Sequence, residues 1–266
     1  MQDLHLHCKY SPDSFTNPNE NIKKCIEKGL DVMAFTDHVD RFCQNNQNFD
    51  LQISTKDYLS FIDNLKEKYK DDIKILKGIE VGIAYENKNK IKDFIEKHNF
   101  DFVIGSIHAV NFKDVWTERR NIEKNPVKSF RKYYQYMIDS VKAVDKFSVL
   151  GHIDYIDRYL EDKSKIPEFK DYEDLIDELL TILIKTNRGI EINTAGYRNG
   201  LSYPNPKDQI LKRYKKLGGE IITLGSDSHT PDTCGYGIYE NIKKLKDMGF
   251  DHISYFENKK EIKVSI

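Results

Sequence analysis

The chain has 266 residues, of which 42 are Lys or Arg and 43 are Asp or Glu, so its formal net charge is −1. This balance argues against a protein that coats nucleic acid, because such proteins usually carry a strong basic excess. Hydrophobic residues make up 39% and charged residues 32% of the chain, which is typical of a globular protein and excludes a disordered or membrane-embedded one.

The cysteines and the amino-terminal residues bear on the cellular compartment. The four cysteines, Cys8, Cys25, Cys43 and Cys234, form no C-x-x-C pair, which excludes a zinc ribbon and a thioredoxin-type motif. No basic stretch with a following apolar run opens the chain, and no apolar run approaches the ~20 residues of a spanning helix. We therefore expect a cytoplasmic protein with reduced thiols and no membrane partner. The sequence does not fix its oligomeric state.

One pattern recurs along the chain: a helix ends near Gly or Asn, a short β-branched run follows, and polar residues come directly after it. An Asn–Pro pair, an N-cap with Pro at the first helical position, marks three helix starts: Asn17-Pro18, Asn125-Pro126 and Asn205-Pro206. The predicted strands are one that carries His5 and His7, then 31–35, 73–81, 102–107, 147–150, 190–193, 221–224 and 252–256. Predicted helices from 17, over 55–69, over 88–98, from 125, over 172–186, over 205–218 and ending at 249 alternate with these strands.

Strands that alternate with helices predict a parallel sheet. About seven or eight such units without a linker or a composition break favour one closed α/β barrel. A doubly wound open sheet is the competing architecture. We expect a single domain over residues 1–266.

Imidazole and carboxylate side chains follow almost every predicted strand. They belong to His5, His7, Asp13, Asp37, His38, Glu80, His108, His152, Asp154, Glu191, Asp227 and His229. In a parallel barrel all strands end at one face, where active sites are built, so we expect these residues to converge although they span most of the chain. Six of the eight histidines fall in this set, whereas core histidines without a shared role have no reason to collect at strand ends.

These residue types predict a metal centre. His5 and His7 are two apart on a strand and therefore on one face, so both rings can reach one ion. The ligand candidates are too many for one ion, which takes four to six ligands, and two or three divalent ions are implied. The ligand types suit zinc, iron or manganese alike. Cys8 is expected to be a small packed residue, because strand alternation turns it away from His7.

Several motifs occur in order along the chain: His5-Leu6-His7, Ser11-Pro12-Asp13, Phe35-Thr36-Asp37-His38, Gly78-Ile79-Glu80, Gly105-Ser106-Ile107-His108, Gly151-His152 and Gly225-Ser226-Asp227-Ser228-His229. With them the whole chain resembles the polymerase-and-histidinol-phosphatase (PHP) superfamily. The stretch 191–196 and the pair Tyr203-Pro204 resemble its monofunctional histidinol-phosphate phosphatase branch.

The resemblance implies a distorted TIM-like (β/α)7 barrel with a trinuclear metal centre. It implies one ion held by His5, His7, Glu80 and Asp227, a second held by Glu80, His108 and His152 with Glu80 bridging, and a third held by Asp13, His38 and His229. Many relatives have His at the position of Asp13, so the third site is richer in oxygen ligands here.

The resemblance also implies an activity. It is the hydrolysis of L-histidinol phosphate to L-histidinol and phosphate, a step of histidine biosynthesis, by attack of a metal-bound hydroxide on phosphorus. Arg158 and Arg198 follow the fifth and sixth strands and are candidates to bind the phosphate, since Arg suits bidentate phosphate recognition. The donor of a proton to the leaving alkoxide stays open among a metal-bound water, Asp227 and His229.

Long loops over residues 39–54, 111–125, 194–204 and 230–236 follow the strands. They carry aromatic residues that either wall a pocket for a flat leaving group or pack over the barrel mouth: Phe42, Phe112, Trp116, Tyr197 and Tyr203.

Three other functions compete with this interpretation. The first is a PHP phosphoesterase that acts on another small phosphomonoester, such as a sugar phosphate or a nucleotide. The second is an amidohydrolase, whose barrel also begins with His-x-His but would have a bridging Lys at the fourth strand end, where this chain has His108. The third is a protein that binds metal or phosphate without catalysis, which the complete ligand set disfavours. The near-neutral charge predicts no nucleic-acid partner.

Overall fold

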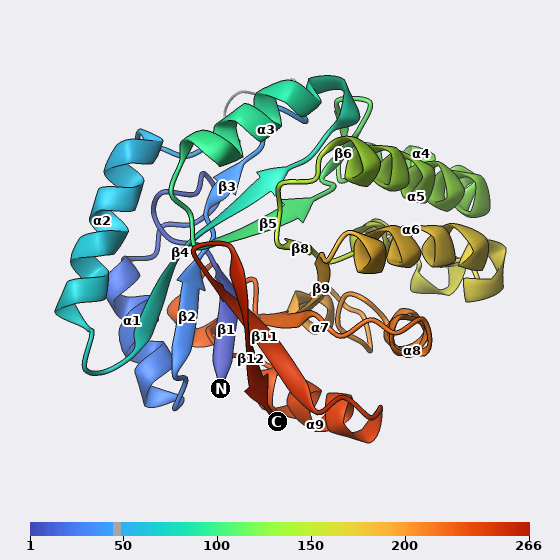
Figure 1. Cartoon of the computed structure of the whole chain (residues 1–266). Helices are drawn as coiled ribbons and strands as arrows, with labels where there is room; N and C mark the ends of the chain where they lie inside the picture. The colour runs from blue at the N-terminus through green and yellow to red at the C-terminus, as the bar shows by residue number, and fades with distance from the viewer. Residues whose placement is uncertain (45–48) are drawn as a thin grey trace.

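The computed structural model describes residues 1–44 and 49–266. Seven parallel strands form one curved sheet in the order β1-β2-β4-β5-β8-β9-β10 (Figure 1). Their bounds are β1 Gln2–Leu6, β2 Val32–Phe35, β4 Lys74–Gly82, β5 Phe102–Ser106, β8 Val149–Leu150, β9 Gly189–Asn193 and β10 Ile222–Gly225. A further short strand, β3 (His38–Val39), pairs with the end of β4.

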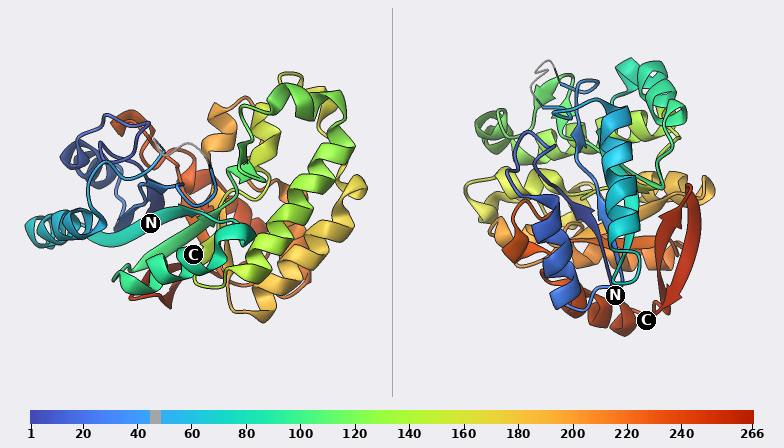
Figure 2. Two further views of the ribbon diagram at one scale, coloured as in Figure 1. Left: turned by 90° about the horizontal axis from the view of Figure 1, so that it is seen from above. Right: turned by 90° about the vertical axis from the view of Figure 1, so that its left-hand side faces the viewer.

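Helices connect these strands and cover the outside of the sheet (Figures 1 and 2). One main helix follows each strand of the barrel: α1 Pro18–Glu27, α2 Thr55–Lys68, α3 Lys88–Lys97, α5 Pro126–Ala143, α6 Glu173–Lys185, α8 Asp208–Lys216 and α9 Ile238–Asp247. Short elements lie in the loops: β6 Ala109–Val110, β7 Lys113–Asp114, α4 Arg119–Lys124, the 3-10 turn Tyr155–Tyr159 and α7 Ala195–Arg198. In the described part of the chain, no helix is long and apolar enough to cross a membrane.

The sheet nearly closes into a barrel between its first and last strands. The backbone N–H of His7 donates to the carbonyl oxygen of Ser228 at 2.8 Å, and the backbone N–H of Ser228 donates to the carbonyl oxygen of His5 at 3.3 Å. Gly225 permits this approach, because an added Cβ there would collide with the Cβ of His5. The predicted distorted TIM-like (β/α)7 barrel is confirmed, and the doubly wound sheet is excluded.

The last predicted strand does not continue the barrel. It is β11 (His252–Glu257), which pairs antiparallel with β12 (Lys260–Ser265), a strand the sequence pattern did not reveal. The hairpin lies across the barrel (Figure 1), and it contacts the first residues of β1 and β5, so it covers the amino-terminal ends of the strands. Phe256 stacks on Phe102 with ring centroids 5.6 Å apart, and Gln2 donates to the carbonyl of Ser254 at 2.7 Å. The hairpin therefore seals the apolar end of the barrel.

Two of the three Asn–Pro helix starts are confirmed. The side chains of Asn17 and Asn125 cap α1 and α5 by accepting from backbone N–H groups two and three residues later. The third is wrong: α8 begins at Asp208, its N-cap is Lys207, and Asn205 is buried with its side chain turned elsewhere. The four cysteines are free and buried. Cys8 is a packed residue, as expected, and its thiol donates a hydrogen bond to Asp37.

Candidate metal centre

A cavity of about 400 Å³ lies at the carboxyl ends of the barrel strands. The nine metal ligands implied by the family resemblance all meet here, although they come from seven different loops or strand ends. Seven of them line the cavity itself: Asp13, His38, Glu80, His108, His152, Asp227 and His229. His5 and His7 lie beneath it, fully buried, at the end of β1.

Glu80, near the end of β4, stands between two groups of histidines. Its Oε1 lies 2.9 Å from Nε2 of His152 and 3.2 Å from Nε2 of His108. Its Oε2 lies 3.2 Å from Nε2 of His5 and 3.1 Å from Nδ1 of His38. Burial opposes ionisation, but the charges of the surrounding histidines outweigh it and hold the pKa of Glu80 well below its usual value. Glu80 is therefore a carboxylate whose two oxygens face two separate sets of imidazoles.

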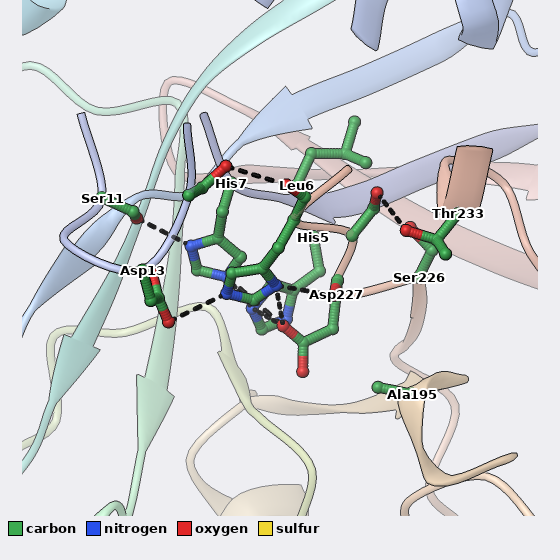
Figure 3. Close-up of polar contacts among 12 residues, drawn as sticks. His5, Leu6, His7, Ser11, Asp13, Ala195, Ser226, Asp227 and Thr233 are labelled. Atoms are coloured by element: carbon green, nitrogen blue, oxygen red, sulfur yellow. Dashed lines mark hydrogen bonds and ion pairs between the residues drawn. The ribbon is translucent and has the colours of Figure 1, made fainter. Parts of the chain in front are cut away.

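His5, His7 and Asp227 form the first group (Figure 3). Nε2 of His5 and Nε2 of His7 are 3.1 Å apart, and Oδ1 of Asp227 lies 3.6 and 3.4 Å from them. Burial and the neighbouring imidazoles of His229 and His38 lower the pKa of His7 to about 3, so its ring is neutral at pH 7. A neutral imidazole is the form that binds metals.

His108 and His152, beside Oε1 of Glu80, form the second group. Asp13, His38 and His229 form a third group at the mouth of the cavity. Oδ2 of Asp13 lies 3.0 Å from Nε2 of His229 and 3.5 Å from Nε2 of His38. Ligand atoms of these three residues and of His7 all lie within 4.8 Å of one another. Asp13 is exposed, unlike the buried carboxylate of Glu80, so this group is the most open to solvent.

Three of the histidines are oriented through their other ring nitrogen. Nδ1 of His5 lies 2.5 Å from Glu191, Nδ1 of His108 lies 2.9 Å from Asp40, and Nδ1 of His7 lies 2.9 Å from Ser11. A proton on Nδ1 satisfies each contact and leaves Nε2 bare toward the cluster, an arrangement found behind most metal-binding histidines.

Sequence reasoning assigned no role to Glu191 or Asp40. Glu191 was visible as a carboxylate at a strand end. Asp40 was overlooked, although it follows His38 by two residues in the same loop. A second carboxylate near a strand-end histidine is the signal that could have found both.

The donor set fits divalent cations. Nε2 of His5 and Nε2 of His7 are 3.1 Å apart, and Nε2 atoms of His108 and His152 are 3.4 Å apart. Two lone pairs at such distances repel, so each contact needs a proton or a metal cation between the two nitrogens. Among the described residues, four His/Asp/Glu groups bring their ligand atoms within 4.8 Å of one another, and all offer only nitrogen and oxygen donors. One group, Glu80 with His108 and His152, equals a ligand set implied by the family resemblance. Two others overlap with the remaining sets, and the fourth joins Asp40 to His38 and His108. The centre therefore has the composition of a divalent metal site.

Arg158 and Arg198 lie beside these groups in the same cavity. Nη2 of Arg198 donates to the carbonyls of Ser226 and Asp227 at 2.6 and 3.0 Å, while its buried Nη1 has no partner among the described residues. Nη1 of Arg158 donates to Oδ2 of Asp227 at 3.1 Å. Since a buried guanidinium nitrogen without a partner is costly, the cavity is suited to an anion.

A second cavity, of about 590 Å³, shares a wall with the first. Both are lined by Asp13, His38, His108, Tyr155 and Tyr159. Phe112 and Trp116 wall the second cavity, as one of the two interpretations of the loops predicted, together with the carboxylates of Asp114 and Glu118. The cavity combines flat apolar walls with negative charge.

The other loop aromatics lie elsewhere. Phe42 packs against Phe94, with ring centroids 5.7 Å apart, and the hydroxyl of Tyr203 donates to Asp157 at 2.7 Å. Tyr197 contacts Asn241 on α9. Residues 45–48 of the loop expected over 39–54 lie outside the described residues.

Comparisons with known proteins agree with this geometry. The family model of the PHP domain matches residues 3–195. The histidinol-phosphatase of Lactococcus lactis is 31% identical over 98% of both chains. A probable histidinol-phosphatase of Clostridium acetobutylicum is 32% identical over 97% of both chains.

A solved structure is similar over the same extent. It is the crystal structure of the histidinol phosphate phosphatase from Lactococcus lactis complexed with zinc, L-histidinol and phosphate. It superimposes with a TM-score of 0.87 at 29% identity and covers 98% of both chains.

Proposed function

The chain belongs to the PHP domain family, and from this premise and the geometry of the centre we infer that it is a metal-dependent phosphatase that hydrolyses L-histidinol phosphate to L-histidinol and phosphate. The observation that carries the inference is the position of Glu80. One carboxylate oxygen faces His108 and His152 while the other faces His5 and His38, next to an arginine with an unpaired nitrogen.

We propose two to three divalent ions, with zinc, iron or manganese as candidates. Zinc is favoured by the zinc-containing structure of the Lactococcus relative. The ions would be held in three sets: His5, His7, Glu80 and Asp227; Glu80, His108 and His152; and Asp13, His38 and His229. Divalent cations bound there supply Lewis acidity, which activates water and offsets the charge of the phosphoryl oxygens.

The residues of the chain supply binding and orientation. Arg198 offers its Nη1, which has no partner among the described residues, to a phosphate oxygen, and Arg158 approaches the same cavity from the neighbouring loop after β8. The hydroxyl of Ser106 donates to Oε1 of Glu80 at 2.7 Å and fixes the bridging carboxylate. Burial opposes ionisation of Asp227, but His5, His7 and Arg158 hold its pKa well below the usual value, so it enters the reaction as a carboxylate. Of the two side chains considered as proton donors, this argues against Asp227.

The second cavity suits the alcohol half of histidinol phosphate. With the phosphate between the arginines and the ions, the leaving group extends past Tyr155 into a space walled by Phe112 and Trp116. Asp114 can pair with a cationic ammonium or imidazolium group there, because a carboxylate in a partly buried site favours a cation. We therefore propose a small phosphomonoester, and not a nucleic acid, as the substrate.

We also propose that one phosphatase domain spans residues 1–266. The family model ends at residue 195, yet Arg198, Asp227 and His229 complete the cavity. The loop after β10 carries the last two, and its Ser228 also closes the barrel against the end of β1.

Steady-state turnover of histidinol phosphate tests the proposal, with metal content measured on the same sample. A panel of sugar phosphates and nucleotides is assayed in parallel, since the alternative is another small phosphomonoester. We expect kcat/KM to be highest for histidinol phosphate and to vanish when a chelator removes the metal. A higher kcat/KM for a panel member would replace the substrate, and absent hydrolysis by fully metallated protein would leave only a binding function.

A further inference from the structure

Two buried asparagines lie on either side of Arg158. Asn193 ends β9, and Asn205 lies in the loop that returns toward it. Their backbones form an antiparallel bridge with N–O distances of 2.7 and 2.8 Å. Residues directly opposite each other in an antiparallel pair point to the same face. The two carboxamides are therefore neighbours, and both are fully buried.

Each carboxamide oxygen accepts a hydrogen bond from the guanidinium. Nε of Arg158 donates to Oδ1 of Asn205, and Nη2 donates to Oδ1 of Asn193, both at 2.7 Å. The amide nitrogens face carboxylates: that of Asn205 donates to Asp154 at 2.6 Å, and that of Asn193 donates to Asp227 at 3.2 Å. Turning either amide over would place N–H against N–H and oxygen against oxygen, so both orientations are fixed.

We propose that Asn205, paired with Asn193, is a positioning residue that fixes the plane of the Arg158 guanidinium for the substrate phosphate without neutralising its charge. This rests on the proposed function. A guanidinium has five N–H donors. Asn205, Asn193 and Asp227 occupy three of them, which leaves one on each Nη for phosphate oxygens.

The two amides are neutral, so they hold the guanidinium of Arg158 without offsetting its positive charge. Carboxylates would hold the guanidinium equally well, but each would offset its charge and compete with the phosphate. Here only Asp227 pairs ionically with Arg158, within the described residues. The face of Tyr155, 5.2 Å from the guanidinium carbon, adds support without charge. The guanidinium is thus held on several sides and keeps most of its attraction for an anion.

Asn205 is the informative residue to change. Asn193 also contacts Glu191, Asp227 and His5, so its substitution would disturb the metal centre directly. Among the described residues, the side chain of Asn205 forms hydrogen bonds only with Arg158 and Asp154. A substitution of Asn205 can therefore affect phosphate binding only by way of Arg158.

The test is a double-mutant cycle on the binding of inorganic phosphate, measured by calorimetry with the metallated full-length protein. N205A is expected to raise the Kd of phosphate about tenfold to hundredfold, the range for one hydrogen bond to a charged group. Metal content is expected to be unchanged. In the R158K background, which lacks the Nε–H donor, N205A is expected to change the Kd less than about twofold. An unchanged Kd in the wild-type background, or the same fold-change in both backgrounds, overturns the proposal.

Further variants keep the test decisive if N205A folds poorly. N205D keeps the size and the acceptor oxygen but adds a charge beside Arg158, so it is expected to raise the Kd of phosphate at least as much as N205A does. A Kd at or below that of the wild type overturns the proposal. N241A is the matched control, because Asn241 on α9 is equally buried but its side chain bonds to Gly237 and Tyr197 and not to Arg158, so it is expected to lower Tm and leave the Kd unchanged.

Kinetics separate this proposal from the proposed substrate. With histidinol phosphate, N205A is expected to raise KM in parallel with the Kd of phosphate and to change kcat much less, which a general loss of structure would not do. If the wild type fails to hydrolyse histidinol phosphate while the phosphate cycle gives the expected coupling, the substrate assignment is wrong and the positioning role stands.

Discussion

Nδ1 of His5 lies 2.5 Å from Oε1 of Glu191, and both side chains are buried. This contact fixes the tautomer of a histidine whose Nε2 faces Glu80 and His7. The same carboxylate accepts the backbone N–H of His152 at 3.0 Å through its other oxygen. Glu191 therefore orients residues from two of the three proposed metal sets without lying among them.

We expect E191Q to lower metal affinity about tenfold to hundredfold, because the amide keeps the shape but removes the charge that makes the His5 ring more basic. Zinc titration and metal analysis after dialysis measure the change. E178Q is the matched control, since Glu178 is an exposed residue of α6 that pairs with Lys142. Wild-type affinity in E191Q would mean that Glu191 only fills space.

R198A should raise KM for histidinol phosphate about tenfold to hundredfold while metal content stays intact. The reason is that the unpaired Nη1 of Arg198 is then lost as a donor to the phosphate. The control is R131A, because Arg131 is a partly exposed arginine of α5 that pairs with Asp174. A wild-type KM in R198A would remove this residue from the phosphate site.

The metal-free protein should lose stability as the pH rises above neutrality. Burial disfavours the charged form of His38, but Glu80 and Asp13 outweigh it and raise its pKa to about 9. A pKa raised on folding stabilises the fold fully below the unfolded value of about 6.5, and that contribution is lost as the pH passes the folded value. Burial is likewise outweighed at His5 by Glu191 and Glu80 and at His108 by Asp40 and Glu80, so both pKa values are raised and both residues act in the same direction.

Denaturant unfolding of chelator-treated protein from about pH 6 to pH 10 measures this effect. Each such histidine contributes at most about 1.4 kcal/mol per pH unit within its window. H38Q should reduce the slope of the unfolding free energy against pH by the contribution of one histidine. H98Q should leave this slope unchanged, because His98 lies at the end of α3 and bonds to Phe94, away from the cluster. A slope that H38Q does not alter would contradict the prediction.

F256A should separate the stability of the barrel from the chemistry of its rim. The ring of Phe256 is buried against Phe102 at the end of the barrel opposite to the metal centre. Its removal should cost about 3–5 kcal/mol of unfolding free energy. Metal content and KM, measured well below the transition temperature, should be unchanged. A loss of metal without a loss of stability would show that the hairpin acts on the site.

The identical dipeptides Asn125-Pro126 and Asn205-Pro206 show which structural roles a local sequence pattern can predict. At Asn125 the side chain caps the helix that follows, as the dipeptide predicts, because its partner is the N–H of Lys128, three residues away. At Asn205 the same residues serve another purpose. The partners are Arg158 and Asp154, 47 and 51 positions earlier, which no local pattern can reveal.

The sequence by itself determined the alternation of strands and helices and the collection of imidazoles and carboxylates at strand ends. Parallel strands in a barrel all end at one rim, so that placement alone required His5, Glu80, His152 and Asp227 to converge. Only the tertiary structure decided which partner each of them faces. The roles of Asp40, Glu191 and Asn205 depend on distances between distant segments, and so does the docking of the hairpin β11–β12. These distances are set by the closure of the barrel and the packing of its loops, which leave no mark at a fixed spacing along the chain.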